Sequence, residues 1–283
     1  MIYLLTKPNN FTVNYKINEW MEPEKFGNSD WAKAQNEHQN LVSVLGDKAE
    51  VLDSVALPDF VFTANHAVVY NGKALLSHFS NPERQKEEAY IQRMFGCLNW
   101  DGYLDAVLPW PSHDLYFEGA GDCIWDEKRK VFWMGHGPRT SLESRELVAK
   151  LFGVNVLPLE LKYPWYHLDL VFCVLPGGEV MYYPGGLTQK SQELLEWLVL
   201  PDDRIILTKE DAEKFAANSI SFDKEIIMSD RVSNELIKTL KRGYYLRYMN
   251  LDSFKKAGGG AACLALNLDV GKSNDEWKLH ISR

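Results

Sequence analysis

The hydrophobic and polar positions of the chain form a block pattern that recurs along its length. In the first block, an apolar run over 61–70 leads into Asn71-Gly72, a second apolar run covers 74–77, and apolar residues at helical spacing follow over 82–95. Two apolar runs joined by Asn-Gly are typical of a β-hairpin with a two-residue turn. This block therefore predicts a strand, a tight turn, a strand and a helix.

The same order of elements occurs three more times. The predicted hairpins cover 123–134, 170–183 and 219–228, and the helical patterns after them cover 142–152, 189–198 and 233–241. A fifth copy begins at Cys263, and we expect the N-terminal apolar run over 2–6 to complete it. Equivalent points of the five copies, about 45 to 57 residues apart, carry Asn65, Asp122, Asp169, Asn218 and Cys263. Such a period predicts an α/β fold of five like units in a closed ring, with these residues facing a central polar channel.

Two segments before the first block have patterns of their own. Apolar residues at helical spacing over 31–45 predict a helix that Ser29 or Asp30 caps and Gly46 ends. The polar and aromatic stretch over 9–28 has no clear period and is longer than most connections, which favours a binding loop or lid. No Pro/Ser-rich linker divides the chain, so we predict a single domain over 1–283.

The composition excludes several classes of partner. The formal net charge is -8 at pH 7, whereas nucleic acid or an anionic membrane requires a basic face, so neither is expected as a partner. The four cysteines lie far apart without a CxxC pair, which argues against a zinc site or a disulfide framework. The N-terminus does not resemble a signal peptide, and no apolar run approaches a membrane span. We therefore expect free thiols and a reducing cytoplasm.

A triple glycine at 258–260 precedes Cys263, at a point where the chain enters an apolar run. Three consecutive glycines are costly to order, so they indicate a backbone path that side chains would obstruct. A thiol held at such a bend is suited to be a nucleophile, although a lone cysteine is commonly packed as a small hydrophobe. No Gly-Lys-Ser/Thr follows the glycines, which argues against a phosphate loop, and no Gly-x-Ser-x-Gly elbow supports serine chemistry.

His167 is the candidate base for this thiol, and Glu118 is the candidate carboxylate that orients the imidazole. Taken singly, His167 is equally consistent with a hydrogen-bonded histidine of the core or rim. His167 and Asp169 could also bind a metal ion, but no third histidine or cysteine stands at ligand spacing. We therefore expect neither a metal nor a cofactor.

Acidic residues are numerous among the candidate site positions. Asp59, Asp122 and Asp169 belong to this group, although each of them alone could be a turn cap. Carboxylates around a thiol raise its pKa, so the positive charge of a substrate would be needed to stabilise the thiolate. The excess of acids therefore predicts a small cationic ligand.

Four motifs resemble those of the guanidine-modifying enzymes of the pentein superfamily, which comprise arginine deiminases, dimethylarginine dimethylaminohydrolases, amidinotransferases and arginine dihydrolases. The motifs are Phe62-Thr-Ala-Asn65, Phe117-Glu-Gly-Ala-Gly-Asp122, His167-Leu-Asp169 and Gly258-Gly-Gly-Ala-Ala-Cys263. The resemblance implies a five-bladed ββαβ propeller. It also implies that Cys263 attacks a guanidinium carbon to form a covalent thiouronium, that His167 moves the protons, and that Glu118 fixes the imidazole and contacts the guanidinium.

The resemblance implies substrate-binding roles for six further residues. The guanidinium nitrogens would be held by Asn65, Asp122 and Asp169, the α-ammonium group by Asp59, and the carboxylate by Arg84 and Arg139. Two arginines that can grip a carboxylate favour a free amino acid, L-arginine or a close relative, over agmatine.

Two features distinguish this chain from the deiminases and dimethylargininases. Those enzymes generally have an aspartate in place of Asn65 and a shorter Glu-Gly-Gly-Asp motif, whereas both features here resemble the arginine dihydrolases, which release two ammonia and carbon dioxide and leave ornithine. An amide can donate as well as accept, so it tolerates the carbonyl oxygen of a ureido group. Among the candidate activities we rank arginine dihydrolase first and arginine deiminase second, followed by dimethylargininase or amidinotransferase. The alternative class is a non-catalytic binding module, like the ribosome anti-association factors of this fold, and the sequence leaves open whether the chain forms a homo-oligomer.

Overall fold

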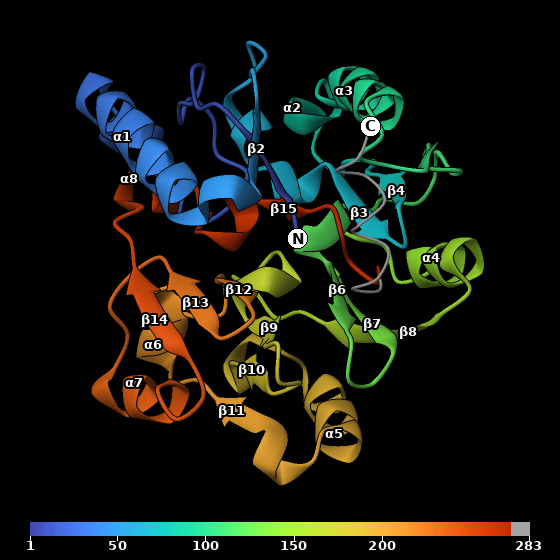
Figure 1. The fold of residues 1–283 in the computed structure, drawn as a ribbon, viewed down its shortest axis with the longest axis vertical. Coiled ribbons are helices and arrows are strands. Elements are labelled where there is room, and N and C mark those ends of the chain that lie inside the picture. The colour runs from blue at the N-terminus through green and yellow to red at the C-terminus, as the bar shows by residue number, and fades with distance from the viewer. Residues whose placement is uncertain (273–283) are drawn as a thin grey trace.

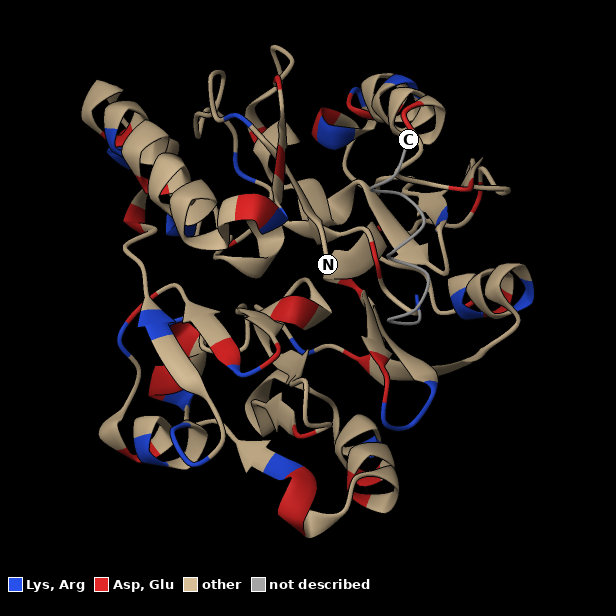
Figure 2. Cartoon of the chain, in the orientation of Figure 1, with Lys and Arg blue, Asp and Glu red and all other residues tan. Residues whose placement is uncertain are grey.

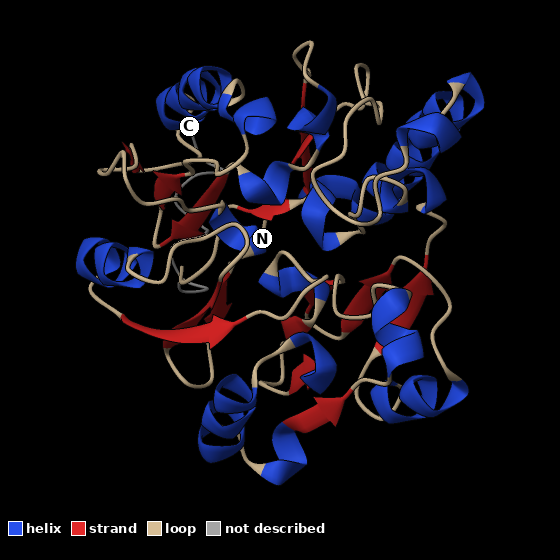
Figure 3. Cartoon of the chain, turned by 180° about the vertical axis from the view of Figure 1, so that it is seen from behind, coloured by secondary structure: helices blue, strands red, loops and turns tan. Residues whose placement is uncertain are grey.

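The computed structural model describes residues 1–272, which form five three-stranded sheets arranged about the middle of the molecule (Figure 1). In each sheet the first two strands pair antiparallel, the second and third pair parallel, and a helix lies between the parallel strands in the chain. The longer helices lie toward the outside of the molecule, while short helical segments lie in its middle (Figure 3). The repeat predicted from the sequence is confirmed as an α/β fold of five like units.

The elements of the first two units have the following bounds. The first unit has β3 (Ala67–Tyr70), β4 (Lys73–Leu76), α2 (Pro82–Gln85), α3 (Glu88–Trp100) and β5 (Ala106–Leu108). The second has β6 (Cys123–Asp126), β7 (Val131–His136), α4 (Ser144–Phe152) and β8 (Asn155–Glu160).

The third and fourth units each add a short helix after their last strand. The third has β9 (Phe172–Val174), β10 (Val180–Tyr182), α5 (Gln189–Leu198), β11 (Arg204–Ile206) and α6 (Lys209–Glu213). The fourth has β12 (Ile220–Phe222), β13 (Glu225–Met228), α7 (Asn234–Leu240), β14 (Tyr245–Tyr248) and α8 (Asp252–Lys255).

The fifth unit joins the two ends of the described chain. Its strands are β15 (Leu266–Asn267), β1 (Tyr3–Thr6) and β2 (Ala49–Leu52), and its helix is α1 (Asn28–Leu45). Strand β1 is central, because Leu4 pairs with Leu266 on one side and with Glu50 on the other. The N-terminal strand therefore completes the fifth unit, as the sequence predicts.

The hairpins form where the apolar pattern predicts them. At the first turn, Asn71 and Gly72 have φ values of 46° and 72°, the left-handed conformation that a type I′ turn requires at both positions. Helix α3 packs on the same unit through Ile91, Phe95 and Leu98, which recur at helical spacing and belong to one buried cluster with Ala74 of β4. Each unit thus buries its apolar face between sheet and helix.

Several predicted boundaries are wrong. The predicted strand over 61–70 begins only at Ala67, because Pro58–Val61 and Thr63–Asn65 form 3-10 turns, and 3-10 turns also occupy the start of the predicted strands at Leu168–Leu170 and Ala262–Leu264. The predicted helix over 82–95 is divided into α2 and α3. The side chain of Asp30 does cap α1, but from within its first turn, where it accepts the backbone N–H of Gly27 at 3.0 Å.

Charged residues of both signs are interspersed over the outer helices and loops (Figure 2). Within residues 1–272, none of the helices combines the length and the hydropathy needed to cross a membrane. The predicted single domain over 1–283 stays a prediction, since residues 273–283 lie outside the described part of the chain.

Candidate active site

Seven of the nine predicted site residues lie on or next to the short turns that precede the hairpins, whereas Arg84 lies in α2 and Arg139 follows β7. Asn65 ends the turn Thr63–Asn65, which packs against the turns Gly119–Gly121 and Ala262–Leu264 from two other units. Because each turn leads into the inner strand of its sheet, these side chains meet in the middle of the fold. His167 is extended, but Asp169 lies in the 3-10 turn Leu168–Leu170, so the two residues do not share one face of a strand.

The triple glycine is enclosed by side chains, as its cost predicts. A Cβ atom on Gly258 would lie 2.5 Å from Tyr166 Oη, and one on Gly259 would lie 2.4 Å from Phe62 Cε1. Gly258 also has a φ of 89°, which L side chains rarely adopt. The backbone can therefore approach the aromatic rings only because these positions lack side chains, and this path leads directly to Cys263.

The Cys263 thiol is buried between two polar side chains. Its Sγ accepts a hydrogen bond from Asn218 Nδ2 at 3.0 Å and donates one to Asp169 Oδ2 at 3.3 Å. The side-chain oxygen of Asn218, Oδ1, also accepts the backbone N–H groups of Gly260 and Cys263. Burial, together with the negative charge of Asp169, raises the pKa of Cys263 well above its ordinary value. The thiol is therefore neutral in the ligand-free protein.

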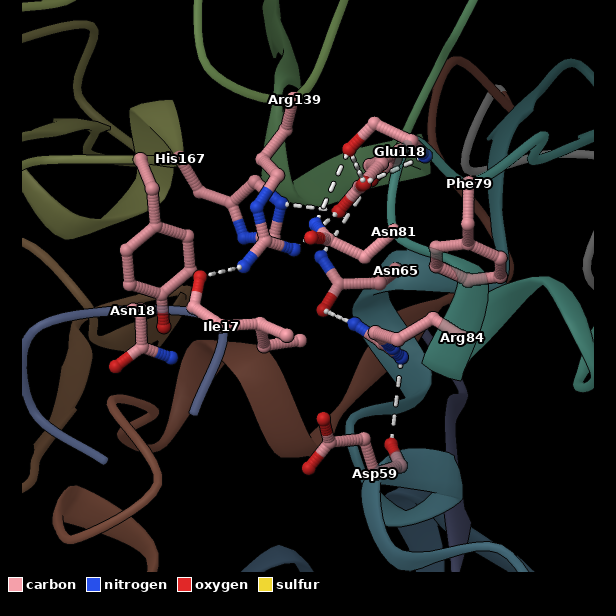
Figure 4. A network of polar contacts seen from close by, with 12 residues as sticks. Ile17, Asn18, Asp59, Asn65, Phe79, Asn81, Arg84, Glu118, Arg139 and His167 are labelled. Atoms are coloured by element: carbon pink, nitrogen blue, oxygen red, sulfur yellow. Dashed lines mark hydrogen bonds and ion pairs between the residues drawn. The ribbon is translucent and has the colours of Figure 1, made fainter. Parts of the chain in front are cut away.

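His167 and Glu118 form a buried pair. The His167 Nε2 lies 2.8 Å from Glu118 Oε2 (Figure 4). Burial opposes ionisation of Glu118, but Arg139 and the hydrogen bond from His167 outweigh it and lower the pKa of the carboxyl. Burial lowers the pKa of His167 to about 4 despite that hydrogen bond, so the imidazole is neutral at pH 7. An ionised carboxylate only accepts, so Nε2 carries the proton and Nδ1 is the basic nitrogen.

The Glu118 carboxylate is saturated by protein donors. Its Oε1 accepts Ser80 N at 3.2 Å and Ser80 Oγ at 2.9 Å, and its Oε2 accepts Arg139 Nη1 at 3.1 Å in addition to His167. The predicted orienting contact to His167 is therefore present. In this conformation the carboxylate is already engaged on both oxygens.

A narrow pocket lies between these groups and the loop that follows β1. Its wall includes six of the nine predicted site residues, Asp59, Asn65, Arg84, Arg139, His167 and Cys263. The loop contributes Ile17, Asn18 and Met21, and its Ile17 carbonyl oxygen accepts Arg139 Nη2 at 2.9 Å. The cavity volume is ≈ 20 Å³, which is about the space of one water molecule.

Two of the predicted carboxylates lie behind the pocket wall. Asp122 is fully buried, and its oxygens accept Thr140 Oγ1 at 2.7 Å and the backbone N–H of Leu168 at 3.0 Å. Asp169 contacts Cys263 through Oδ2, while its Oδ1 has no hydrogen-bond partner among residues 1–272. Burial raises the pKa of Asp169 to about 7. Asp169 is thus adjacent to the nucleophile, whereas Asp122 is engaged by the surrounding backbone and hydroxyl.

The pocket wall contains both acidic and basic side chains. Asp59 lies in its wall, accepts Tyr15 Oη at 2.9 Å on Oδ2, and has no hydrogen-bond partner for Oδ1 within the described chain. Arg139 stacks on the Tyr166 ring, 4.8 Å from its centroid. The described residues do not bring three His, Cys, Asp or Glu side chains together as a metal site.

Residues that contact the predicted groups were missed by sequence reasoning. Asn218 was recognised only as a repeat marker, although it holds the thiol and the glycine loop. Ser80, Glu87 and Thr140 were not recognised at all, because serines, threonines and helical glutamates are common on surfaces. The only signal for Glu87 is its position three residues after Arg84, which places both side chains on one side of a helical turn.

Five ββαβ units whose turns bring together a cysteine, a histidine and buried carboxylates define a guanidine-modifying enzyme of the pentein superfamily. Residues 7–269 match the family model described as N,N dimethylarginine dimethylhydrolase, eukaryotic, and the chain belongs to this family.

Similar proteins include two of named activity. The bifunctional arginine dihydrolase/ornithine cyclodeaminase AgrE of Nostoc sp. (strain PCC 7120) is 37% identical over 272 residues, which cover 94% of this chain and 37% of that protein. The N(G),N(G)-dimethylarginine dimethylaminohydrolase of Mycobacterium tuberculosis is 29% identical over 270 residues, which cover 94% of this chain and 85% of that protein. The chain thus spans little more than a third of the length of the bifunctional relative.

The fold is also similar to solved structures. The substrate-bound N-terminal domain of ArgZ, an arginine dihydrolase from the ornithine–ammonia cycle in cyanobacteria, has a TM-score of 0.88 at 34% identity and covers 95% of this chain and 98% of that chain. A dimethylarginine dimethylaminohydrolase adduct with S-methyl-L-thiocitrulline has a TM-score of 0.74 at 19% identity, and this likeness concerns the fold alone.

The raised pKa of Cys263 predicts low thiol reactivity in the free protein. At pH 7.5 we expect iodoacetamide to alkylate the exposed Cys97 at least about tenfold faster than Cys263, since the thiolate is the reactive form. Asp169→Asn removes the neighbouring charge, which lowers the pKa and should accelerate labelling of Cys263 several-fold. Peptide mass spectrometry follows both cysteines, with Cys97 as the internal control, and an unchanged Cys263 rate in Asp169→Asn would contradict the electrostatic cause.

Proposed function

We propose that this chain is an arginine dihydrolase, which converts L-arginine and two water molecules into ornithine, two ammonia and carbon dioxide. The observation that carries the proposal is that Cys263 and His167 line one pocket with Asn65, a neutral amide at the place where a carboxylate would disfavour a ureido intermediate. The similarity to relatives named as arginine dihydrolases supports it. The family model, which is described by dimethylarginine hydrolysis, supports dimethylargininase as the second candidate.

The proposal includes the arrangement of the site within the fold. The five sheets are the blades of a ββαβ propeller, and the turns before the hairpins line its central polar channel. The packing of the turn Thr63–Asn65 against Gly119–Gly121 and Ala262–Leu264 supports this arrangement, because the three turns belong to three different units. The substrate would then be enclosed by residues from all around the ring.

The first step begins with the transfer of the Cys263 proton to the basic Nδ1 of His167. A bound guanidinium places a positive charge beside the sulfur and offsets the burial that raises the thiol pKa. The thiolate forms a C–S bond with the guanidinium carbon, and the imidazolium returns its proton to the departing nitrogen as the C–N bond breaks. Ammonia leaves, and a covalent thiouronium remains on Cys263.

Water completes the first hydrolysis and the second one follows on the same carbon. Neutral His167 takes a proton from the attacking water, the C–S bond breaks, and a citrulline-like ureido group forms in the pocket. A second attack by Cys263 expels the second ammonia, and hydrolysis of the resulting thiocarbamate gives a carbamate that loses carbon dioxide. Glu118 stabilises the imidazolium at each proton transfer.

The contacts around the pocket support roles at the other end of the substrate. The Asp59 Oδ1 would accept the α-ammonium group, and Arg139 would bind the carboxylate after exchanging its contact with the Ile17 carbonyl oxygen. Asp169 Oδ1 would accept a guanidinium N–H next to the sulfur. Asp122 would act by holding Thr140 and the backbone before Asp169, and not by direct contact.

Removal of the nucleophile tests the proposal. Cys263→Ser should lower the rate of ammonia release from L-arginine by at least about a thousandfold, since a buried serine is a far weaker nucleophile at neutral pH. Cys97→Ser is the matched control and should retain full activity. Ammonia and amino-acid products are quantified by chromatography. Ornithine with two ammonia supports the dihydrolase, citrulline indicates a deiminase, and dimethylamine from dimethylarginine indicates a dimethylargininase. Undiminished activity of Cys263→Ser would exclude this nucleophile.

Replacement of the Asn65 amide by a carboxylate tests the proposed second hydrolysis. In Asn65→Asp the aspartate faces the ureido oxygen, so we expect citrulline to accumulate and ornithine formation to fall by about tenfold or more, or about 1.4 kcal/mol of transition-state stabilisation. Asn71→Asp, in the first hairpin turn, makes the same change away from the pocket and should leave the products unaltered. Ornithine production by Asn65→Asp at the wild-type rate would refute this role for the amide.

We also propose that the predicted lid over 9–28 opens to admit the substrate, because the cavity volume of the pocket is only ≈ 20 Å³. L-arginine bound to Cys263→Ser should hold the loop closed and slow tryptic cleavage at the exposed Lys16 by about threefold or more. Cleavage at the exposed Lys241, at the end of α7, serves as the control and should not change. Equal cleavage at Lys16 with and without ligand would contradict a closing loop.

A further inference from the structure

Arg84 is held inside the protein more tightly than a substrate-binding arginine needs to be. Its Nε donates to Glu87 Oε1 at 3.0 Å and its Nη2 to Glu87 Oε2 at 2.9 Å, a bidentate pair in which both side chains are buried. Nη2 also donates to the Asp59 carbonyl oxygen at 3.3 Å, and Nη1 donates to Asn65 Oδ1 at 2.9 Å. A guanidinium has five N–H donors, and four hydrogen bonds to its own chain leave too few for a bidentate grip on a carboxylate.

The contact to Asn65 determines which way its amide faces. Arg84 can only donate, so the Asn65 oxygen must point toward Arg84 and its NH₂ group must point away (Figure 4). The amide nitrogen then lies 3.4 Å from the Glu118 carbonyl oxygen. One hydrogen of the NH₂ group is directed to that carbonyl, and the other is available to a ligand.

The NH₂ group lies beside the imidazole. A Cβ atom on Gly121 would lie 2.3 Å from Asn65 Nδ2 and 3.4 Å from His167 Nδ1, so both nitrogens border the same small space. Asn65, His167 and Cys263 all line the pocket. The donor that Arg84 turns inward therefore belongs to a residue of the pocket wall and lies near the proposed base.

The Asn65 NH₂ donor distinguishes the guanidinium of the first hydrolysis from the ureido group of the second. A guanidinium offers only N–H groups, which cannot pair with another N–H donor, whereas a ureido group offers a carbonyl oxygen that can. We propose that Glu87, by holding Arg84, is a positioning residue that keeps the Asn65 amide donor-inward and thereby selects the citrulline-like intermediate for the second hydrolysis. This inference rests on the proposed dihydrolase function.

The same geometry adds a role for Arg84. Its predicted part in binding the substrate carboxylate stays a prediction, and its contact to Asn65 orients the amide. The pair also packs against an aromatic side chain, because the Arg84 guanidinium lies over the Phe79 ring at 4.4 Å.

Glu87→Gln tests the inference, because the amide keeps the shape of the side chain but turns an NH₂ group toward the Arg84 donors. The Asn65 amide would then be free to rotate. We expect ammonia release per arginine to fall from two toward one, and the rate with L-citrulline as the supplied substrate to fall about tenfold, while release of the first ammonia stays within about threefold of wild type. Glu87→Asp retains the charge and should recover part of the second step.

Asp126→Asn is the matched control. Asp126 is a buried carboxylate that pairs with Arg129, three residues later, at 2.9 Å, and it lies on β6 away from the pocket. The Asp126→Asn variant should lower the melting temperature as Glu87→Gln does, but it should still release two ammonia per arginine. Glu87→Gln with unchanged stoichiometry, or with both steps slowed equally, would overturn the inference. Wild-type protein that releases no ammonia from arginine would instead refute the proposed function itself.

Discussion

The site depends on the pairing of the buried, ionised Glu118 carboxylate with donors from the protein. A charge fully removed from water is tolerated only when its oxygens are paired, and Glu118 is paired with Ser80, Arg139 and His167, which belong to three different units. The units can therefore bury this group only when they have come together in the correct register. Burial keeps His167 neutral, and the contact to Glu118 fixes its proton on Nε2 and leaves Nδ1 as the basic nitrogen.

Cys263, the proposed nucleophile, has a low reactivity in the free protein. Burial and Asp169 keep Cys263 protonated, and His167 is neutral beside it, so the free enzyme holds no reactive ion pair. In the proposed reaction, the positive charge of the substrate stabilises the Cys263 thiolate. The proposed specificity for positively charged ligands would then follow from the same electrostatics that suppress side reactions of the thiol.

Much of the fold could be predicted because its signals are local. Hairpin turns such as Asn71-Gly72 have a distinct chemistry, and the apolar spacing of α5 gives its bounds without error. The third strand of each unit was not recognised, since these strands are short and several are half-exposed, as in the run Ala49–Leu52. The turns before the hairpins were mistaken for strand because their residues are as apolar as strand residues, and only the need to aim Asn65 and Asp169 inward explains the bend.

The candidate residues with unusual chemistry were identified from motifs, but their partners were not. Cys263, His167 and Glu118 stand in recognisable motifs, whereas the contacts of Glu87 and Asn218 are defined only by the folded structure. Arg84 illustrates the difference, since its motif predicts a ligand contact and its neighbours indicate an internal one.

The pairing of β1 with β15 has a consequence for how the protein is made. Strand β1, the first strand of the described chain, is central to a sheet in which Leu266–Asn267 forms one edge. It therefore cannot complete its pairing until nearly the whole described chain has been synthesised. Cys263 lies only three residues before β15 and leaves the ribosome in the same interval. A nascent chain therefore cannot assemble the nucleophile ahead of the ring that encloses it, and incomplete chains carry the histidine and carboxylates without the thiol.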